Sequence, residues 1–294
     1  MPELPEVETI VNDLNKEIKG NIISDVLVFN QRTFKNYSPK TRELIKNSKI
    51  EKFERRGKYI IFHLKKANNP RALRAELSSY DGENSFLITH LKMTGNFSIL
   101  KSADLGAIKN IKHARAVFIL KSKDALIFKD IRKFGKIYFE NKNSSDDLEI
   151  TKKLGPDALL NLNLKEFENN ISKRKTKIKP LLLNQEFIAG LGNIYADESL
   201  WASKIHPLTP ANKLSKKQIK TLFNSIQKIL KTAVALRGSS MRDYKDLMGK
   251  DGGYIKIRKV YMRECLPCFR CKAKIVKIKI GQRSAHFCPK CQRI

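Results

Sequence analysis

The chain has 294 residues, 41% of them hydrophobic and 8% aromatic, so it can bury the cores of two domains. No stretch approaches 18 uninterrupted apolar residues and the start is acidic, which argues against a membrane span or a signal peptide and predicts a cytosolic protein. The formal net charge of +30 favours a polyanionic partner such as nucleic acid; a membrane surface and a merely solvated basic surface are the alternatives.

Close to the start of the chain, apolar residues recur at helical spacing. Pro5 suits the first position of a helix, and Gly20 can end it. We therefore expect a short amphipathic helix between them, whose apolar stripe comprises Val7, Ile10, Val11, Leu14 and Ile18.

From Ile22 to Glu140 the pattern changes to short runs rich in Ile, Val, Phe and Tyr, separated by polar turns. Examples are KYIIFHL, SFLITHL, RAVFILK, ALIFKDI and KIYFE. Such runs are typical of strands, and their regular spacing predicts an antiparallel sandwich or barrel. The polar stretch NKNSSDD, at 141–147, is the expected domain boundary.

Beyond this boundary the sequence becomes helical. Ser215 and Gln218 have the spacing of a capping box. The apolar stripe that follows runs towards Gly238 and comprises Ile219, Leu222, Phe223, Ile226, Ile229 and Leu230. The glycines of the next segment, MGKDGGY, make a flexible loop that either closes over a ligand or simply connects two elements.

All five cysteines lie between positions 265 and 291, which predicts a metal site rather than disulfides in a cytosolic protein. Two Cys-x2-Cys pairs, Cys268 with Cys271 and Cys288 with Cys291, predict one structural Zn²⁺ ion. The alternating segment between the pairs predicts a β-hairpin that turns at Gly281 and Gln282. Cys265 also has the correct spacing from Cys268, but the later pair gives the more compact hairpin.

The opening MPELPEVE combines a proline at position 2 with acidic residues. Removal of Met1 would expose Pro2 as a terminal secondary amine, whose pKa of roughly 8 makes it a usable nucleophile at neutral pH. Glu3 would supply a carboxyl group for proton transfer. The alternative is an ordinary first turn of a helix, where proline and acidic residues are both favoured.

Six signatures occur in one order along the chain: MPELPEVE, RRGKYI, HLKMTG, DIRKFG, LLLNQEFIAGLGNIYADESLW and the cysteine module. In this order they resemble the bacterial formamidopyrimidine-DNA glycosylases over essentially the whole chain. The resemblance implies an α+β protein of two domains, with a catalytic β-sandwich over 1–140, a helix-two-turn-helix domain over 148–260 and a zinc finger over 261–294. It also implies a monomer that binds double-stranded DNA containing oxidised bases or abasic sites.

The resemblance assigns catalytic roles to four residues. Pro2 matches the nucleophile, Glu3 the catalytic acid, Lys58 the catalytic lysine on the loop that faces the lesion and its phosphate, and Arg283 the proton donor of the second elimination. Taken alone, Lys58 is an ordinary surface residue at the start of a strand.

Further positions match residues that support the site or contact DNA. Glu6 matches a supporting carboxylate, and the phosphate-contacting or DNA-contacting positions are His90, Asn193, Tyr261, Lys277 and Arg283. Met93, Arg132 and Phe134 resemble the three residues that fill the void left by the extruded nucleotide, although Met93 and Phe134 otherwise suit a core. Residues 238–254 resemble a mobile loop that covers the extruded base.

The implied activity is removal of 8-oxoguanine and formamidopyrimidines from duplex DNA, through a Schiff base on Pro2, followed by elimination on the 3′ and then the 5′ side. One alternative is the sister endonuclease VIII branch, which acts on oxidised pyrimidines; another is a zinc-finger nucleic-acid-binding protein without catalytic activity. The sequence departs from the family pattern at Cys265 and at 65–84, where we expect an inserted surface hairpin.

Overall fold

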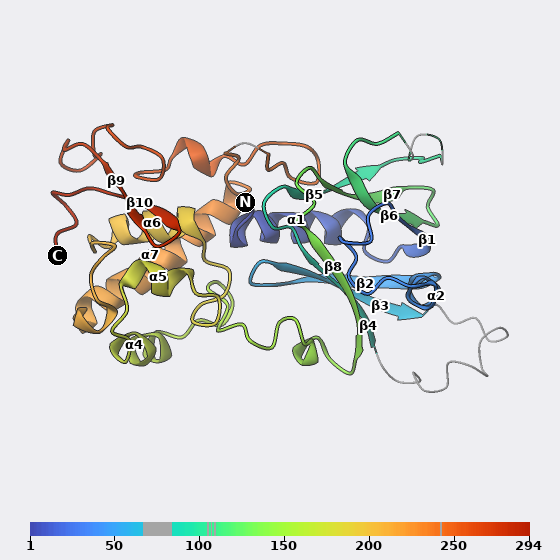
Figure 1. Ribbon diagram of the computed structural model, residues 1–294, viewed down its shortest axis with the longest axis horizontal. Helices are drawn as coiled ribbons and strands as arrows, with labels where there is room; N and C mark the ends of the chain where they lie inside the picture. The colour runs from blue at the N-terminus through green and yellow to red at the C-terminus, as the bar shows by residue number, and fades with distance from the viewer. Residues whose placement is uncertain (67–83, 105, 107, 109, 242) are drawn as a thin grey trace. The chain divides into compact units, whose positions relative to one another are not determined.

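The computed structural model describes residues 1–66, 84–104, 106, 108, 110–241 and 243–294, which form two compact units (Figure 1). The first unit comprises Met1–Pro2, Glu6–Lys152 and Ser240–Gly252, and the second comprises Glu3–Pro5, Lys153–Ser239 and Gly253–Ile294. The hairpin expected at 65–84 lies almost wholly outside the described residues. Among the helices of the described chain, none combines the length and the apolar character that crossing a bilayer requires.

The predicted N-terminal helix is present as α1, Leu4–Glu17, and starts one residue before Pro5. Its apolar stripe is buried, as the helical spacing predicted: Val7, Ile10, Leu14 and Ile18 are fully buried and Val11 nearly so. These side chains join the main hydrophobic core of the first unit. Burial of this stripe against strands is what stabilises a helix of only four turns.

The eight strands of the first unit pair in the order β5-β7-β6-β1-β2-β3-β4-β8, and every pair is antiparallel. The short helix α2, Pro39–Ile45, connects the first two strands. The strands are β1 Ile22–Val28, β2 Ser48–Arg56, β3 Tyr59–Lys66, β4 Asn84–His90, β5 Gly95–Leu100, β6 Ala114–Leu120, β7 Ala125–Asp130 and β8 Lys136–Lys142.

The sheet divides into two layers at the junction of β1 and β2, which is only two residue pairs long. Phe62 on β3 packs against Phe97 on β5 and Phe118 on β6, with ring centroids 5.8 Å apart in both pairs. These strands are not neighbours in the sheet, so the contacts join opposite layers, which Figure 1 shows as separate groups of strands. The predicted antiparallel sandwich is therefore confirmed.

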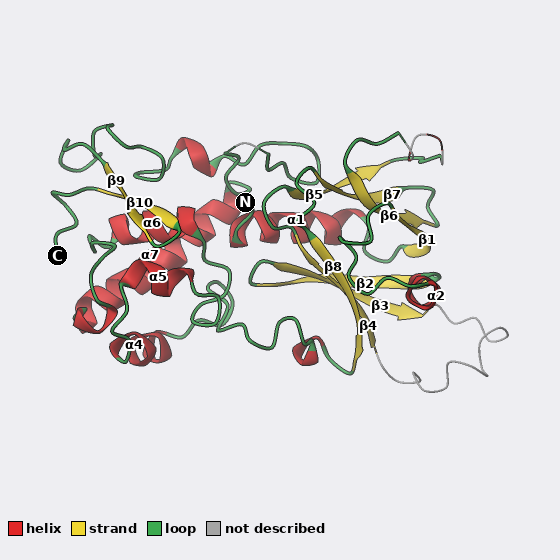
Figure 2. Ribbon diagram, in the orientation of Figure 1, coloured by secondary structure: helices red, strands yellow, loops and turns green. Residues whose placement is uncertain are grey.

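The second unit is helical, and its described strands are the hairpin β9–β10 (Figure 2). The capping box predicted for α7 is present: Ser215 Oγ accepts from Gln218 N at 3.3 Å, and Gln218 Oε1 accepts from Ser215 N at 2.9 Å. The elements are α4 Leu164–Ser172, α5 Ile178–Leu183, α6 Asn193–Ala202, η3 Ala211–Lys213, α7 Lys216–Ala235, η4 Tyr254–Lys256, β9 Val276–Ile280 and β10 Arg283–Phe287.

The stretch predicted to separate the domains contains more structure than a loop. Strand β8 continues to Lys142, and Ser145–Asp147 forms the short 3-10 helix η2. The long segment of the first unit that contains the strands continues to Lys152. The three domain ranges inferred from the sequence stay predictions.

Replacing Phe62 with alanine removes the ring that joins the two layers. We expect Phe62→Ala to lower the free energy of unfolding by about 3 to 5 kcal/mol, because the buried ring is removed and a cavity remains. Phe29→Ala is the matched control, since Phe29 is 46% exposed, and it should change stability by less than about 0.5 kcal/mol. Urea unfolding of both variants measures the difference, and equal destabilisation would contradict the assigned packing.

Candidate active site and nucleic-acid interface

The residues that follow Pro2 are held against the start of α6 in the second unit. Glu3 is 2% exposed. Its Oε1 accepts from the backbone N–H of Ile194 at 3.1 Å, and its Oε2 accepts from that of Tyr195 at 3.5 Å. Leu4 N donates to Gly190 O at 3.1 Å. The carboxylate thus satisfies N–H groups that the first turn of a helix leaves unpaired, and the helix dipole stabilises its charge.

Glycine is required at position 192 for this arrangement. A Cβ atom at Gly192 would lie 2.2 Å from Cδ of Glu3, which is closer than any real contact. The close approach explains one glycine of the AGLGN motif by sterics. Sequence reasoning assigned this motif to phosphate binding and did not foresee its contact with Glu3.

Pro2 and Glu6 belong to the first unit, where both are buried. Met1, which precedes Pro2, is 43% exposed. The backbone oxygen of Glu6 accepts from the hydroxyl of Tyr244 at 3.4 Å. Tyr244 and Leu247, both in the loop expected to cover an extruded base, are buried in the main core of the first unit. This loop is therefore anchored to the unit that carries Pro2.

Four residues that the sequence predicted to be functional lie near the start of α6: Glu3, Asn193, Tyr261 and Arg283. Burial raises the pKa of Tyr261, while a hydrogen bond from Asn193 opposes the rise. The charges of Glu3 and Arg283 also act on the Tyr261 phenol. The predicted acid Glu3 and three predicted phosphate contacts therefore share one region of the second unit.

A buried carboxylate that sequence reasoning missed holds the segment of Tyr261 in place. Glu198, on α6, accepts three consecutive backbone N–H groups, from Lys259 at 2.8 Å, Val260 at 2.8 Å and Tyr261 at 2.9 Å. Burial raises the pKa of Glu198, and the three N–H donors oppose the rise. Its only sequence signal is an acidic residue inside a helix, which usually indicates a solvated surface.

A second missed group fixes the hairpin to the helices. Asp197, on α6, hydrogen-bonds Lys179 on α5, the Nδ1 atom of His286 at 3.0 Å and the backbone N of His286 at 2.9 Å. Lys179 also donates to the backbone oxygen of Ser284. Asp197, Lys179 and His286 are all almost completely buried, and each therefore needs these partners. Arg283 is adjacent to this anchored segment.

The two predicted phosphate contacts on the hairpin point to different faces. In the register of β9 and β10, Lys277 is opposite His286 and Arg283 is opposite Ile280. Successive residues of a strand alternate between faces, so Lys277 and Arg283 lie on opposite sides. Lys277 Nζ is 3.2 Å from Glu264 Oε1, and the hairpin turns at Gly281 and Gln282 as predicted.

The four predicted zinc ligands are together. The Sγ atoms of Cys268, Cys271, Cys288 and Cys291 all lie within 4.8 Å of one another. A tetrahedral ion with Zn–S bonds of about 2.3 Å requires sulfur atoms about 3.8 Å apart, so the four cysteines fit one Zn²⁺ ion. Burial, together with the neighbouring thiols, raises the pKa of Cys291 to about 12, and a cation is what ionises such a group at neutral pH.

Cys265 is exposed and lies outside this cluster, which resolves the alternative pairing in favour of Cys268 with Cys271. Trp201 is the single tryptophan of the chain, and its Nε1 donates to Cys268 Sγ at 3.4 Å. The guanidinium carbon of Arg270 lies 3.8 Å from the centroid of the Trp201 ring. The zinc module is thus packed onto the end of α6.

In the first unit, Lys58 lies in the two-residue turn between β2 and β3, in agreement with the loop position that the resemblance implied. Gly57 has φ of 55°, and only this first central residue has a positive φ, as in a type II′ turn. Arg55 Nη1 donates to Gly57 O at 3.1 Å, and Arg55 also pairs with Glu8. Lys58 itself is only 8% exposed, so most of its side chain is covered by the surrounding residues.

His90 ends β4, as predicted, and is close to Lys58. Burial, followed by the ammonium groups of Lys92 and Lys58, lowers the pKa of His90 to about 3. Its Nδ1 accepts from Lys92 N at 2.9 Å, and Tyr59 contacts the ring edge to face at 4.7 Å between centroids. His90 is therefore a neutral ring at physiological pH, with Nε2–H as its donor.

The three predicted void-filling residues meet on the surface of the first unit. Met93 is 40% exposed and Phe134 is 48% exposed, so neither belongs to the core. Arg132 Nη1 is 3.0 Å from Met93 Sδ, and its guanidinium carbon is 4.8 Å from the centroid of the Phe134 ring. An exposed thioether and an exposed ring beside a guanidinium are suited to insertion between bases.

Asp130, which sequence reasoning did not single out, organises both loops of this cluster. It is fully buried and accepts from Thr94 Oγ1, from Arg132 N at 3.2 Å and from Gly135 N at 2.7 Å. The loop of Met93 and the loop of Arg132 and Phe134 are thereby joined. Lys136, close to Asp130, has other cations nearby: its pKa is lowered mainly by burial and further by the charges of Lys35, Lys92 and Arg32.

Models of three domains match the chain: the formamidopyrimidine-DNA glycosylase N-terminal domain over 1–137, the formamidopyrimidine-DNA glycosylase H2TH domain over 154–245 and the zinc finger found in FPG and IleRS over 266–294. A formamidopyrimidine-DNA glycosylase of Ligilactobacillus salivarius is 37% identical over 99% of both chains. One of Protochlamydia amoebophila is 38% identical over 100% of both.

The chain belongs to the formamidopyrimidine-DNA glycosylase family.

Solved structures of this family have the same fold. A mutant of the Lactococcus lactis enzyme bound to DNA containing Fapy-dG has a TM-score of 0.87, with 34% identity over 100% of both chains. The same enzyme bound to abasic-site DNA has a TM-score of 0.86, with 34% identity over 99% of this chain and 100% of that one. A MutM bound to DNA with carbocyclic 8-oxo-G has a TM-score of 0.85 and 34% identity over 100% of both chains.

The neutral state of His90 predicts a pH dependence of stability. The unfolded histidine takes up a proton near pH 6.5, whereas the folded one does so only near pH 3, so stability is present above pH 6.5 and is lost as the pH falls between these values. His90→Gln should show a shallower loss between pH 6.5 and 4, by at most about 1.4 kcal/mol per pH unit. Urea unfolding at several pH values measures this, and parallel profiles would contradict it.

Removal of zinc should disrupt the packing at Trp201. We expect a strong chelator to release one Zn²⁺ per chain and to shift the tryptophan fluorescence, because the ring contacts Cys268. Cys291→Ser should lower the zinc content in the same way. Cys265→Ser is the matched control and should retain one equivalent of zinc; loss of zinc from that variant would show that Cys265 is a ligand.

Proposed function

We propose that this chain is a bifunctional DNA glycosylase and AP lyase that removes oxidised purines, namely 8-oxoguanine and formamidopyrimidines, from duplex DNA in the bacterial cytoplasm. The observation that carries the proposal is the buried carboxylate of Glu3, adjacent to Pro2 in the chain and held by two N–H groups at the start of α6. Relatives of this family solved with Fapy-dG, 8-oxo-G or abasic-site DNA support the substrate class.

The reaction begins at Pro2 once Met1 has been removed. The neutral imino nitrogen attacks C1′ of the damaged nucleotide, and the bond between C1′ and the base breaks as the electron pair leaves with the base. The proton on the Pro2 nitrogen passes to the carboxylate of Glu3. Opening of the sugar ring then leaves an iminium ion that joins Pro2 to C1′. This iminium acidifies the adjacent C2′ proton, so elimination removes first the 3′ phosphate and then the 5′ phosphate.

We assign the proton transfers of these steps to Glu3. Two N–H donors fix the position of its carboxylate, and this carboxylate accepts the proton from the Pro2 nitrogen. The same proton is then available to the sugar ring oxygen as the ring opens. Glu6 is buried near the start of α1 and supports this segment.

The other predicted residues bind and hold the DNA. Lys58, Asn193, Tyr261, Lys277 and Arg283 supply donors for phosphates, and Arg283 also donates a proton in the second elimination. His90 contributes a neutral N–H donor rather than a charge. Met93, Arg132 and Phe134 fill the space of the extruded nucleotide and offset part of the few kcal/mol that unstacking costs.

Borohydride trapping on duplex DNA tests the proposal. We expect the enzyme to form a covalent complex with 8-oxoguanine opposite cytosine, with the cross-link on Pro2, and Pro2→Ala to form none. Trapping should be weaker on oxidised thymine; the reverse order would favour an endonuclease VIII activity, which matters because an L. lactis relative has been solved with oxidised-pyrimidine DNA. Absence of any cross-link would leave only a DNA-binding protein.

Gly192→Ala separates the role of Glu3 from that of the nucleophile. The new Cβ atom would displace the carboxylate of Glu3, while Pro2 stays intact. We expect at least about a tenfold slower single-turnover cross-linking rate, within the range of proton-transfer catalysis, with little change in affinity for lesion DNA. Gly20→Ala is the control, because a Cβ atom there has open space and its φ of 86° tests only backbone strain, beyond the far end of α1 from Glu3.

A further inference from the structure

The second unit carries a cationic surface that the proposed reaction does not use. It is built from 172–177 and 212–220, neither of which contains an Asp or a Glu. We call it the second cationic surface, and its eight charged residues are Lys173, Arg174, Lys175, Lys177, Lys213, Lys216, Lys217 and Lys220.

The two segments lie side by side. Asn212 N donates to Arg174 O at 2.9 Å, and Ala211 N donates to Thr176 O at 2.9 Å. Lys177 forms an antiparallel bridge with Pro210. The backbone therefore fixes charges that are distant in the sequence on one continuous surface, and does not leave them on two independent loops.

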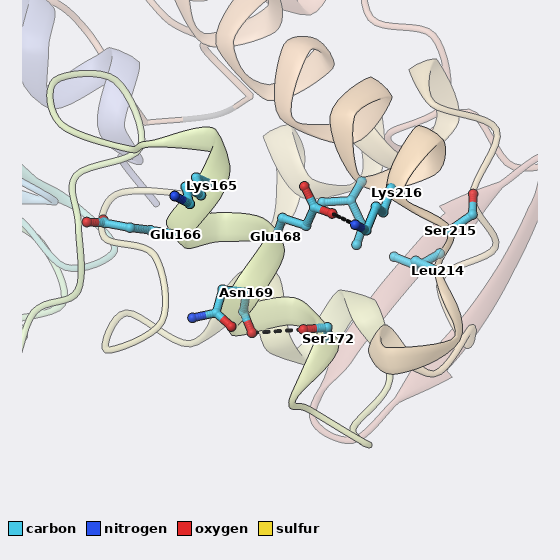
Figure 3. Close-up of a pocket in the computed structure, with 9 residues that line it drawn as sticks. Lys165, Glu166, Glu168, Asn169, Ser172, Leu214, Ser215 and Lys216 are labelled. Carbon is cyan, nitrogen blue, oxygen red and sulfur yellow. Dashed lines mark hydrogen bonds and ion pairs between the residues drawn. The ribbon is translucent and has the colours of Figure 1, made fainter.

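The charges of this surface are largely uncompensated. All eight side chains are exposed. Within the described residues, one of the eight has an ion pair: Lys216 Nζ is 3.9 Å from Glu168 Oε1, at the edge of a cavity of about 980 Å³ between α4 and α7 (Figure 3). Exposed lysines elsewhere do have carboxylate partners, for example Lys101 with Asp124 at 3.0 Å and Lys245 with Asp251 at 2.8 Å.

These cations do not serve the stability of the fold. Lys216 and Lys217 occupy the first turn of α7, which contains no acidic residue. Cations at the start of a helix oppose its dipole, and clustered like charges repel one another. A polyanionic partner would compensate this repulsion.

The surface is distinct from the residues proposed to bind the lesion. Helix α5 separates the two regions: Ile178, its first residue, follows the basic segment, whereas Leu183, its last, lines a small cavity of about 290 Å³ together with Arg283. Six residues of helix span about 9 Å, so both regions of the second unit are within reach of one duplex.

The residue types of the second cationic surface indicate the chemistry of its partner. Seven of the eight cations are lysines, which act as point charges towards phosphate and are less suited than arginine to bidentate base recognition. The exposed large hydrophobic residues of the described chain include none from 172–220, so the surface lacks the apolar anchors that protein partners usually require. We propose that the second cationic surface binds the phosphate backbone of duplex DNA outside the lesion, without regard to sequence.

This role deepens the proposed function, because a repair enzyme must hold undamaged DNA while it searches. Contacts of this kind raise non-specific affinity through the release of counterions. They add nothing to the chemistry at the lesion, so binding and catalysis should respond differently when they are removed.

The test compares two variants. In each, four basic residues are replaced with glutamine. The surface variant carries Lys173→Gln, Arg174→Gln, Lys175→Gln and Lys217→Gln. The control variant carries the same reduction of charge on exposed residues of the first unit: Lys19→Gln, Lys49→Gln, Lys121→Gln and Lys123→Gln. Affinity for an undamaged 30-base-pair duplex is measured by fluorescence anisotropy at several salt concentrations, after thermal melts of both variants.

We expect the slope of log affinity against log salt to fall by about 0.9 for each phosphate that is no longer neutralised, and by about 2 or more in the surface variant relative to the control. Single-turnover cross-linking at saturating enzyme should not change. Equal slopes in the two variants would overturn the proposal, and a selective decrease in polyglutamate binding with equal DNA slopes would assign the surface to an acidic protein instead. A wild-type protein that forms no cross-link would refute the proposed function but leave the comparison of slopes valid.

Discussion

The hydrogen bonds from the first turn of α6 to the Glu3 carboxylate are the interaction on which the site depends. A helix of this length leaves N–H groups unpaired at its start, and a buried carboxylate needs donors, so each satisfies the other. This contact fixes the residue beside Pro2 although 191 positions separate the partners. The same helix start carries Asn193, so the proposed catalytic carboxylate and a proposed phosphate contact have one support.

Helix α6 is the centre of the second unit because it is buried on every side. Its residues from Ile194 to Trp201 are all buried, including two carboxylates. Asp197 holds Lys179 and His286, and Glu198 holds the backbone from Lys259 to Tyr261. Buried charges are tolerated only with such partners, and here the partners are the segments that carry Tyr261 and Arg283. The zinc module is joined at the other end of the helix through Trp201.

In the first unit, a buried carboxylate likewise fixes the loops that carry Met93, Arg132 and Phe134, the residues proposed to fill the void. Fully buried Asp130 accepts hydrogen bonds from the loop that carries Met93 and from the loop that carries Arg132 and Phe134. These bonds fix the backbone of both loops, while the three side chains point outward. Elsewhere the protein leaves charge uncompensated, most clearly on the second cationic surface. The buried carboxylates therefore have partners that fix neighbouring segments, whereas the lysines of the second cationic surface contribute to the net charge of +30 and, in our proposal, to attraction to DNA.

Local patterns in the sequence determined much of this protein. The stripe of α1, the capping box of Ser215, the alternating strands and the spacing of the four zinc cysteines each depend on residues a few positions apart, so they were predictable. The motifs also identified the family. Only the tertiary structure decided that Gly192 makes room for Glu3, that Asp130 and Glu198 are organisers rather than surface acids, that His90 is neutral and that Lys277 faces away from Arg283. These properties depend on partners distant in the sequence and on strand register, which no local pattern contains.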